Sequence, residues 1–169
     1  NPKADGTVDK LAPSDNSVSL LDLENSLRFN NQMMMFDTTP EGLKAILEHG
    51  VAAGTLQGRF PQIGGVAFSW DPDFAAGARV MDIALVAADG SRIGLYDNGS
   101  KLASAPAKIS VVTLSFLAQG GDSYPIKANA DNFRYLVDVA GGGYNLSAAV
   151  PEDRDFTASA TTTEFAAGS

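Results

Sequence analysis

The sequence predicts an α+β domain built of mixed α/β layers, and two observations lead to this class. A short apolar run at residues 32–37 precedes a segment whose apolar side chains recur at helical spacing. Four short apolar or alternating segments follow, separated by turn residues: 63–70, 79–87, 92–96 and 109–116. A strand–helix–strand order followed by paired strands is typical of a mixed α+β domain.

The first expected elements are a buried strand over residues 32–37 and a helix that begins after Thr39. Thr39 can cap the helix, Pro40 suits its first position, and Glu41 suits the positive end of the helix dipole. One apolar stripe then recurs at helical spacing: Leu43, Ile46, Leu47 and Gly50. Gly54 follows as a stop signal for this helix.

The next expected strand covers residues 63–70 and ends at Asp71-Pro72. Residues 79–87 alternate as a half-buried strand does, with Asp82 on one face. The opposite face carries Met81, Ile83 and Leu85.

Turn signals connect the remaining strands. Asp89-Gly90 is favoured in two-residue hairpin turns and should pair the preceding strand with residues 92–96. Residues 97–100 (Asp-Asn-Gly-Ser) are a further turn signal, and residues 109–116 complete the core strands.

The two ends of the chain carry weaker patterns. Residues 1–18 are polar and are expected to be a lead-in or linker, which leaves residues 19–169 as the domain. Residues 131–139 are predicted to form a short helix ended by three glycines at 141–143. Residues 156–169 are rich in Ala and Thr and show no clear period.

Composition restricts the possible partners and cofactors. The net charge of −8 argues against a nucleic-acid backbone or an anionic membrane surface as a partner. The chain has no cysteine and one histidine, His49, so neither a disulfide framework nor a catalytic metal centre is expected within it. His49 falls near the apolar stripe of the helix, where a structural role is favoured over a ligand role. No apolar run approaches the ~20 residues that cross a membrane.

The segment from Phe116 to Tyr124 (Phe-Leu-Ala-Gln-Gly-Gly-Asp-Ser-Tyr) is the most informative part of the chain. Gly120 and Gly121 allow a sharp reversal, which would hold Asp122 close to Phe116. An aromatic ring beside an acceptor carboxylate suits a flat ligand with polar edges, such as a nucleoside. The alternative is a strand end followed by an ordinary turn.

This segment resembles the signature of the C-terminal domain of the 5′-nucleotidase family, which includes UDP-sugar hydrolases and cyclic-nucleotide phosphodiesterases. Three further segments match the family in order. Residues 22–31 resemble the segment that ends in Pro-Phe-Gly-Asn, and residues 43–51, with Glu48-His49, resemble the family's helix. Residues 58–65 resemble the segment that leads into the next strand. The resemblance implies the fold of this C-terminal domain.

The resemblance also implies a set of nucleoside-binding residues. Phe29 and Phe116 match the two rings that clamp the base, although both could instead be core residues. Asn31 matches the asparagine that bonds the base, and Asp122 matches the acceptor of ribose hydroxyls. Gly58 matches a position where the backbone approaches the nucleoside. Asn31 and Gly58 could instead be turn residues.

Some positions depart from the family pattern. Arg28 and Asn30 replace the family's Pro and Gly around the first clamp residue, and Ser123 replaces the Gly after the motif aspartate. Asn30 and Ser123 must therefore tolerate backbone angles that glycine supplies elsewhere. Arg28 and Arg59 flank the clamp and could contact phosphate, or could simply be solvated.

The function implied by the resemblance is nucleotide recognition within a two-domain phosphohydrolase. Two divalent metal ions are expected in an N-terminal metallophosphoesterase domain outside this chain, and rotation of the present domain would carry substrate to them. We therefore expect a fragment of a larger periplasmic or secreted bacterial protein that binds nucleosides and hydrolyses nothing alone. The alternatives are a non-catalytic nucleoside-binding module and a purely structural domain.

Overall fold

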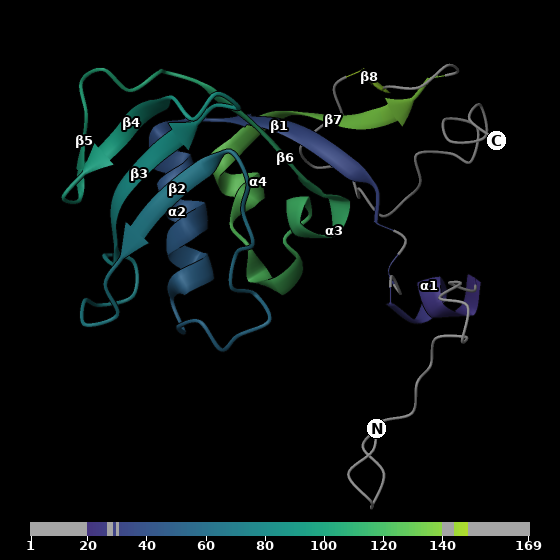
Figure 1. The fold of residues 1–169 in the computed structure, drawn as a ribbon, viewed down its shortest axis with the longest axis horizontal. Helices are drawn as coiled ribbons and strands as arrows, with labels where there is room; N and C mark the ends of the chain where they lie inside the picture. The colour runs from purple at the N-terminus through teal and green to yellow at the C-terminus, as the bar shows by residue number, and fades with distance from the viewer. Residues whose placement is uncertain (1–19, 27–28, 30, 140–143, 149–169) are drawn as a thin grey trace, which may run out of the picture. The chain divides into compact units, whose positions relative to one another are not determined.

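The structure is a computed structural model and describes residues 20–26, 29, 31–139 and 144–148 (Figure 1). The chain divides into two units, Asn1–Asn31 and Gln32–Ser169. In the first unit the described element is a helix, α1 (Leu20–Ser26), whose leucines are exposed. The predicted lead-in at residues 1–18 and the segments 141–143 and 156–169 lie outside the described residues.

The second unit contains two four-stranded antiparallel sheets, which confirms the predicted α+β class (Figure 1). The first sheet has the order β6-β1-β7-β8, with bounds Ile109–Leu114, Met33–Thr38, Ala130–Asp138 and Tyr144–Leu146. The second sheet has the order β2-β3-β4-β5, with bounds Val66–Trp70, Val80–Val86, Arg92–Asp97 and Ser100–Lys101. The helical elements are α2 (Pro40–Val51), α3 (Ser115–Ala118), the short turn η1 (Gly121–Ser123) and α4 (Ile126–Asn129).

Helix α2 begins where the sequence predicts. Thr39 caps it, because its side-chain oxygen accepts a hydrogen bond of 3.1 Å from the backbone N–H of Gly42, and Pro40 is the first helical residue. The predicted stripe faces the protein interior, with Leu43 and Leu47 buried. The backbone takes a left-handed angle, φ +82°, at Gly54, three residues after the helix ends.

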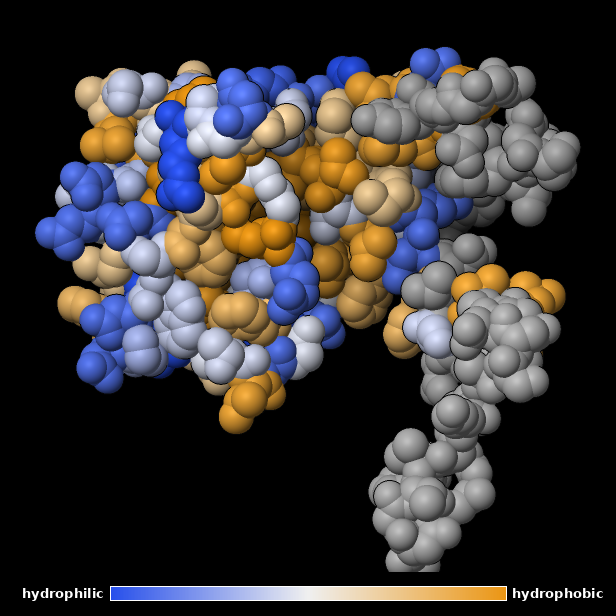
Figure 2. Space-filling model, viewed as in Figure 1, coloured by the Kyte–Doolittle hydropathy of each residue, from blue (hydrophilic) through white to orange (hydrophobic). Residues whose placement is uncertain are grey.

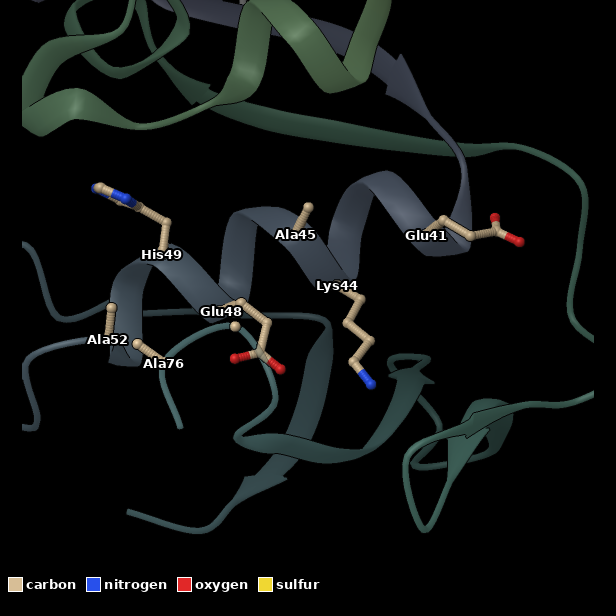
Figure 3. A pocket seen from close by; sticks show the side chains of 8 residues that line it. Glu41, Lys44, Ala45, Glu48, His49, Ala52 and Ala76 are labelled. Atoms are coloured by element: carbon tan, nitrogen blue, oxygen red, sulfur yellow. The ribbon is translucent and has the colours of Figure 1, made fainter. Parts of the chain in front are cut away.

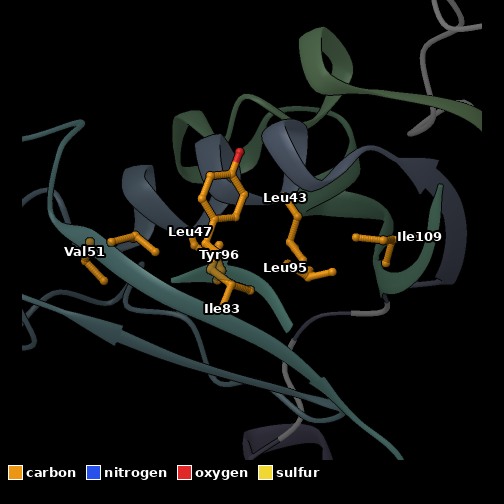
Figure 4. Close-up of a cluster of buried hydrophobic side chains, with 8 residues drawn as sticks. Leu43, Leu47, Val51, Ile83, Leu95, Tyr96 and Ile109 are labelled. Atoms are coloured by element: carbon orange, nitrogen blue, oxygen red, sulfur yellow. The ribbon is translucent and has the colours of Figure 1, made fainter. Parts of the chain in front are cut away.

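Two buried clusters hold the sheets and helices together. In one, side chains of α2 pack against the second sheet and Ile109 of β6: Leu43, Leu47, Val51, Val80, Ile83, Leu95 and Tyr96 (Figure 4). In the other, the inner face of the first sheet packs against the segment that contains α3 and α4: Met34, Phe36, Phe133, Tyr135, Ala118, Tyr124 and Ile126. Helix α2 therefore lies between the two sheets, and α3 and α4 extend the cover of the first sheet (Figure 1).

The helix predicted over residues 131–139 is wrong, because this segment forms strand β7. It pairs with β1, and Phe133 and Tyr135 are buried while Arg134 between them is only half-buried. That alternation has the period of a strand. Its backbone hydrogen-bonding groups pair with β1, a strand far away in sequence, and this pairing favours a strand over a helix.

The predicted strand boundaries also differ from the observed ones, most clearly for β2 and β6. Strand β2 begins at Val66, directly after Gly65, whose φ is +72°. Strand β6 ends at Leu114, so Phe116 lies in helix α3 and outside the strand. Strand β3 runs from Val80 to Val86, close to the predicted range.

The hairpin at Asp89-Gly90 is present, but its turn is longer than predicted. The backbone N–H of Ala87 donates to the carbonyl of Ser91, so three residues separate the paired positions. Gly90, at φ +83°, supplies the left-handed residue of this three-residue loop. The two-residue turn occurs instead at Asn98-Gly99, between β4 and β5, where φ is +47° and +78°.

Candidate functional site

The loop that follows α3 (the motif loop, residues 119–124) folds back onto Phe116 as the sequence predicts. Gly120 takes a left-handed angle, φ +101°. A Cβ atom on Gly121 would lie 2.5 Å from both the ring and the carbonyl oxygen of Phe116, so only glycine fits there without displacing the ring. The pair of glycines thus brings Asp122 and the Phe116 ring to the same end of the first sheet.

Two further residues of the motif loop have left-handed backbone angles. The φ angle is +52° at Asp122 and +62° at Ser123. Such angles cost on the order of 1–3 kcal/mol for a residue with a side chain, and Asp tolerates them better than Ser. Ser123 is therefore held in a conformation that glycine would adopt without strain.

A set of contacts attaches the motif loop to the C-terminal end of α2. His49 Nε2 lies 2.8 Å from the carbonyl oxygen of Asp122, and its ring meets the Tyr124 ring edge-on at 4.9 Å. The Tyr124 hydroxyl donates a hydrogen bond of 2.6 Å to the carbonyl of Arg59. Burial, with the nearby Asp122 charge, raises the pKa of Tyr124, so the phenol stays protonated and able to donate.

Gly58 lies beside this attachment, in the connection between α2 and β2. A Cβ atom there would meet nothing within 4 Å, and its backbone angle is not one that requires glycine. The protein itself therefore gives no steric reason for glycine at this position.

Neither phenylalanine of the predicted clamp is a core residue. Phe116 is 45 % exposed and Phe29 is 80 % exposed. Figure 2 shows apolar residues at the surface in the region of β6 and α3. Val112 and Leu114 of β6 are also exposed. The motif loop, which carries Asp122, meets Phe116 at Gly121 and meets the residue after Gly58 through the bond from Tyr124 to the Arg59 carbonyl.

The other predicted contacts belong to the first unit. Phe29 and Asn31 are described only within that unit, so the pairing of Phe29 with Phe116 stays a prediction. Arg28 and Asn30 lie outside the described residues. Arg59 belongs to the second unit, and its Nε atom is buried without a hydrogen-bond partner among the described residues.

A shallow pocket lies along the exposed side of α2, but its charged groups are already paired (Figure 3). The Glu48 carboxylate, buried at its rim, accepts hydrogen bonds from the backbone N–H groups of Arg79 and Val80, at 3.0 and 2.8 Å. Lys44 donates to the carbonyl of Gly99. Both Glu48 and Lys44 therefore have partners within the protein. The sequence contained no signal for the role of Glu48, because its partners are backbone groups of a distant strand.

Within the described ranges, no group of three or more His, Asp or Glu side chains could hold a metal ion. In the same part of the chain, no helix is long and apolar enough to cross a membrane.

Comparisons with known proteins give relatives by sequence and by structure. Over 116 residues the chain is 23% identical to the trifunctional nucleotide phosphoesterase protein YfkN of Bacillus subtilis, covering 68% of this chain and 7% of that protein. The crystal structure of a 5′-nucleotidase precursor from Thermus thermophilus superposes with a TM-score of 0.55 at 24% identity, over 77% of this chain and 22% of that one. The NAD nucleotidase of Haemophilus influenzae superposes with a TM-score of 0.48 at 21% identity, over 64% and 19%.

The chain thus spans only a small part of each of these relatives. The family model described as "5′-nucleotidase, C-terminal domain" matches residues 4–129, which include the predicted clamp positions and the motif loop. The chain belongs to the 5′-nucleotidase C-terminal domain family.

Proposed function

We propose that this chain is the nucleotide-recognition domain of a two-domain, metal-dependent phosphohydrolase of the 5′-nucleotidase type. The observation that carries the proposal is the exposed Phe116 ring, held against Gly121 beside the exposed Asp122. A free aromatic face can stack on a nucleobase of any identity, and a carboxylate can accept hydrogen bonds from the ribose hydroxyls.

Residues of the first unit would complete the site. Phe29 would place the second ring on the base, and Asn31 would bond its polar edge through an amide that both donates and accepts. Gly58 would let the backbone approach the nucleoside, which fits the open space at its Cβ position.

Catalysis would belong to a metallophosphoesterase domain outside this chain, with two divalent ions that activate water for attack on phosphorus. The small fractions of YfkN and of the Thermus nucleotidase that the chain covers fit this division of labour. We further propose that the intact protein is periplasmic or secreted, where it would release phosphate from nucleotides.

Calorimetry of the 169-residue chain with adenosine and uridine tests the proposal. Phe116→Leu should weaken binding about tenfold or more, because stacking on a ring contributes ~1–3 kcal/mol per base. Phe74→Leu is the matched control, since Phe74 is exposed to a similar degree (48 %) in the loop between β2 and β3. Equal affinities for the two variants would contradict the proposed stacking. No binding by the unmodified chain would favour a purely structural domain.

A further inference from the structure

The attachment of the motif loop to α2 has a feature that packing alone does not require. His49 contacts the backbone of Asp122 itself, the residue proposed to receive the ribose hydroxyls. In Figure 3 the His49 side chain points away from Glu48 and Lys44, toward the segment that carries the motif loop. The other hydrogen bonds recorded for the loop backbone are short-range, such as Ser123 N–H to Gly120 carbonyl, and they link the loop only to itself and to α3.

The surroundings of His49 are tightly packed. A Cβ atom on the next residue, Gly50, would lie 2.7 Å from Pro61 and 2.9 Å from the Tyr124 hydroxyl. Glycine at this point therefore lets the segment after Gly58 and the motif loop approach the helix together. At the same place, the ring of His49 packs edge-on against the ring of Tyr124.

The chemistry of the contact defines the tautomer of His49. A carbonyl oxygen only accepts hydrogen bonds, so Nε2 must carry the proton. The bond then points the carbonyl of Asp122 at the helix. With the Asp122 backbone at φ 52° and ψ 23°, holding this carbonyl also constrains the direction of the Cα–Cβ bond, and so limits the region that the carboxylate can reach.

We propose that His49 is a positioning residue of the nucleoside site, which orients Asp122 for the ribose hydroxyls through its Nε2–H bond to the Asp122 carbonyl. This inference rests on the proposed function. Base stacking on Phe116 does not depend on this bond, so the loss of His49 should affect recognition of the ribose and spare recognition of the base.

A comparison of two ligands separates these effects. Adenosine carries both ribose hydroxyls, and 2′,3′-dideoxyadenosine carries neither, so the ratio of their dissociation constants reports the contribution of the hydroxyls. We expect the unmodified chain to prefer adenosine by about tenfold or more, as for hydrogen bonds to a charged acceptor. His49→Phe keeps a ring against Tyr124 but has no donor, and should reduce the preference to less than about threefold. His49→Gln retains an N–H donor and should restore part of it.

Nuclear magnetic resonance gives an independent test, because His49 is the only histidine in the chain and its signals need no assignment. The ¹⁵N shifts of the unmodified protein should show a protonated Nε2 at neutral pH. A proton on Nδ1 alone, or an unchanged preference for adenosine in His49→Phe, would overturn the inference. Failure of the unmodified chain to bind either ligand would instead overturn the proposed function, and with it the role of His49.

Discussion

At the scale of single residues, backbone geometry explains much of the motif loop before any ligand is considered. Gly121 is needed because a side chain would strike Phe116, and Gly120 is needed for its left-handed angle. Asp122 also has a left-handed angle, which Asp and Asn tolerate well. A test of its ligand role should therefore use Asp122→Asn, which keeps the loop conformation and changes only the acceptor.

A substitution at Gly58 can test nucleoside binding without a loss of protein stability. Gly58→Ala should leave the unfolding temperature unchanged or raise it slightly, since the new methyl group meets no protein atom within 4 Å and alanine is less flexible than glycine in the unfolded chain. It should weaken nucleoside binding severalfold, because a ligand that approaches the backbone would meet the methyl group. Gly64→Ala is the control, as Gly64 is equally open and has no left-handed angle. Thermal unfolding and calorimetry measure the two effects, and equal affinities for both variants would contradict the predicted contact at Gly58.

The buried carboxyl group of Asp37 should make the free energy of unfolding depend on pH. Burial alone would raise the pKa of its carboxyl group, but hydrogen bonds from Asn132, Lys108 and Ser110 outweigh this and lower it to about 2. A depressed pKa in the folded state stabilises the protein above the unfolded pKa of 3.8, and this stabilisation disappears as the pH falls toward 2. The loss should reach about 2 kcal/mol.

Urea unfolding at pH 6 and at pH 2.5 measures this loss. Asp37→Asn should be less stable at pH 6 and should lose less stability on acidification than the unmodified chain. An identical loss in both proteins would show that other carboxyl groups cause the acid sensitivity.

At the scale of elements, α2 organises the second unit through both of its ends. Its first turn is capped by Thr39, and the carbonyls of Val51 and Ala52 at its end accept hydrogen bonds from the Arg79 guanidinium. Glu48 ties the helix to the start of β3. These contacts fix the position of the helix end from which His49 reaches the motif loop.

Glu48→Gln should be markedly destabilising. The two carboxylate oxygens accept the backbone N–H groups of Arg79 and Val80, while an amide has one oxygen and would leave one of these N–H groups without its partner, at a cost of about 1–3 kcal/mol. Glu41→Gln is the matched control on the same helix, because Glu41 forms an exposed ion pair with Lys101. Denaturant unfolding should show a clearly larger loss of unfolding free energy for Glu48→Gln than for Glu41→Gln. Similar losses for the two variants would argue against the stabilising role of the Glu48 hydrogen bonds.

Strand β7 shows that a local sequence pattern does not always distinguish a helix from a strand. Residues 131–139 carry both helix-compatible and strand-compatible residues, and no local turn signal separates the two possibilities. In the structure β1 supplies the backbone partners, and the bulge between Met35 and Asp37 accommodates Asn132 at φ +55°. A partner 95 residues away in sequence, as for Asn132 and Asp37, cannot be recognised from a short window.

At the scale of the whole molecule, we expect nucleoside binding and phosphate release to be carried out by different domains. The 169-residue chain should release no phosphate from AMP, with or without added Mg²⁺ or Mn²⁺, and EDTA should change its affinity for adenosine less than about twofold. The reason is that the proposed function assigns the catalytic metal ions to a domain outside this chain. A colorimetric phosphate assay beside calorimetry measures both quantities. Metal-dependent phosphate release by this chain would contradict the proposed division.

The sequence by itself determined the α+β class, the start of α2, the positions of the turns near residues 89–90 and 98–99, and the family. These depend on local spacing and on the Phe-x-x-x-Gly-Gly-Asp-x-Tyr motif. Only the tertiary structure showed that Phe116 lies on a helix, that residues 131–139 form a strand, and that His49 holds the motif loop. Each of these depends on contacts between segments that are distant in the chain. Such contacts leave no periodic pattern in the sequence, since each partner occupies a position that other residues could also fill.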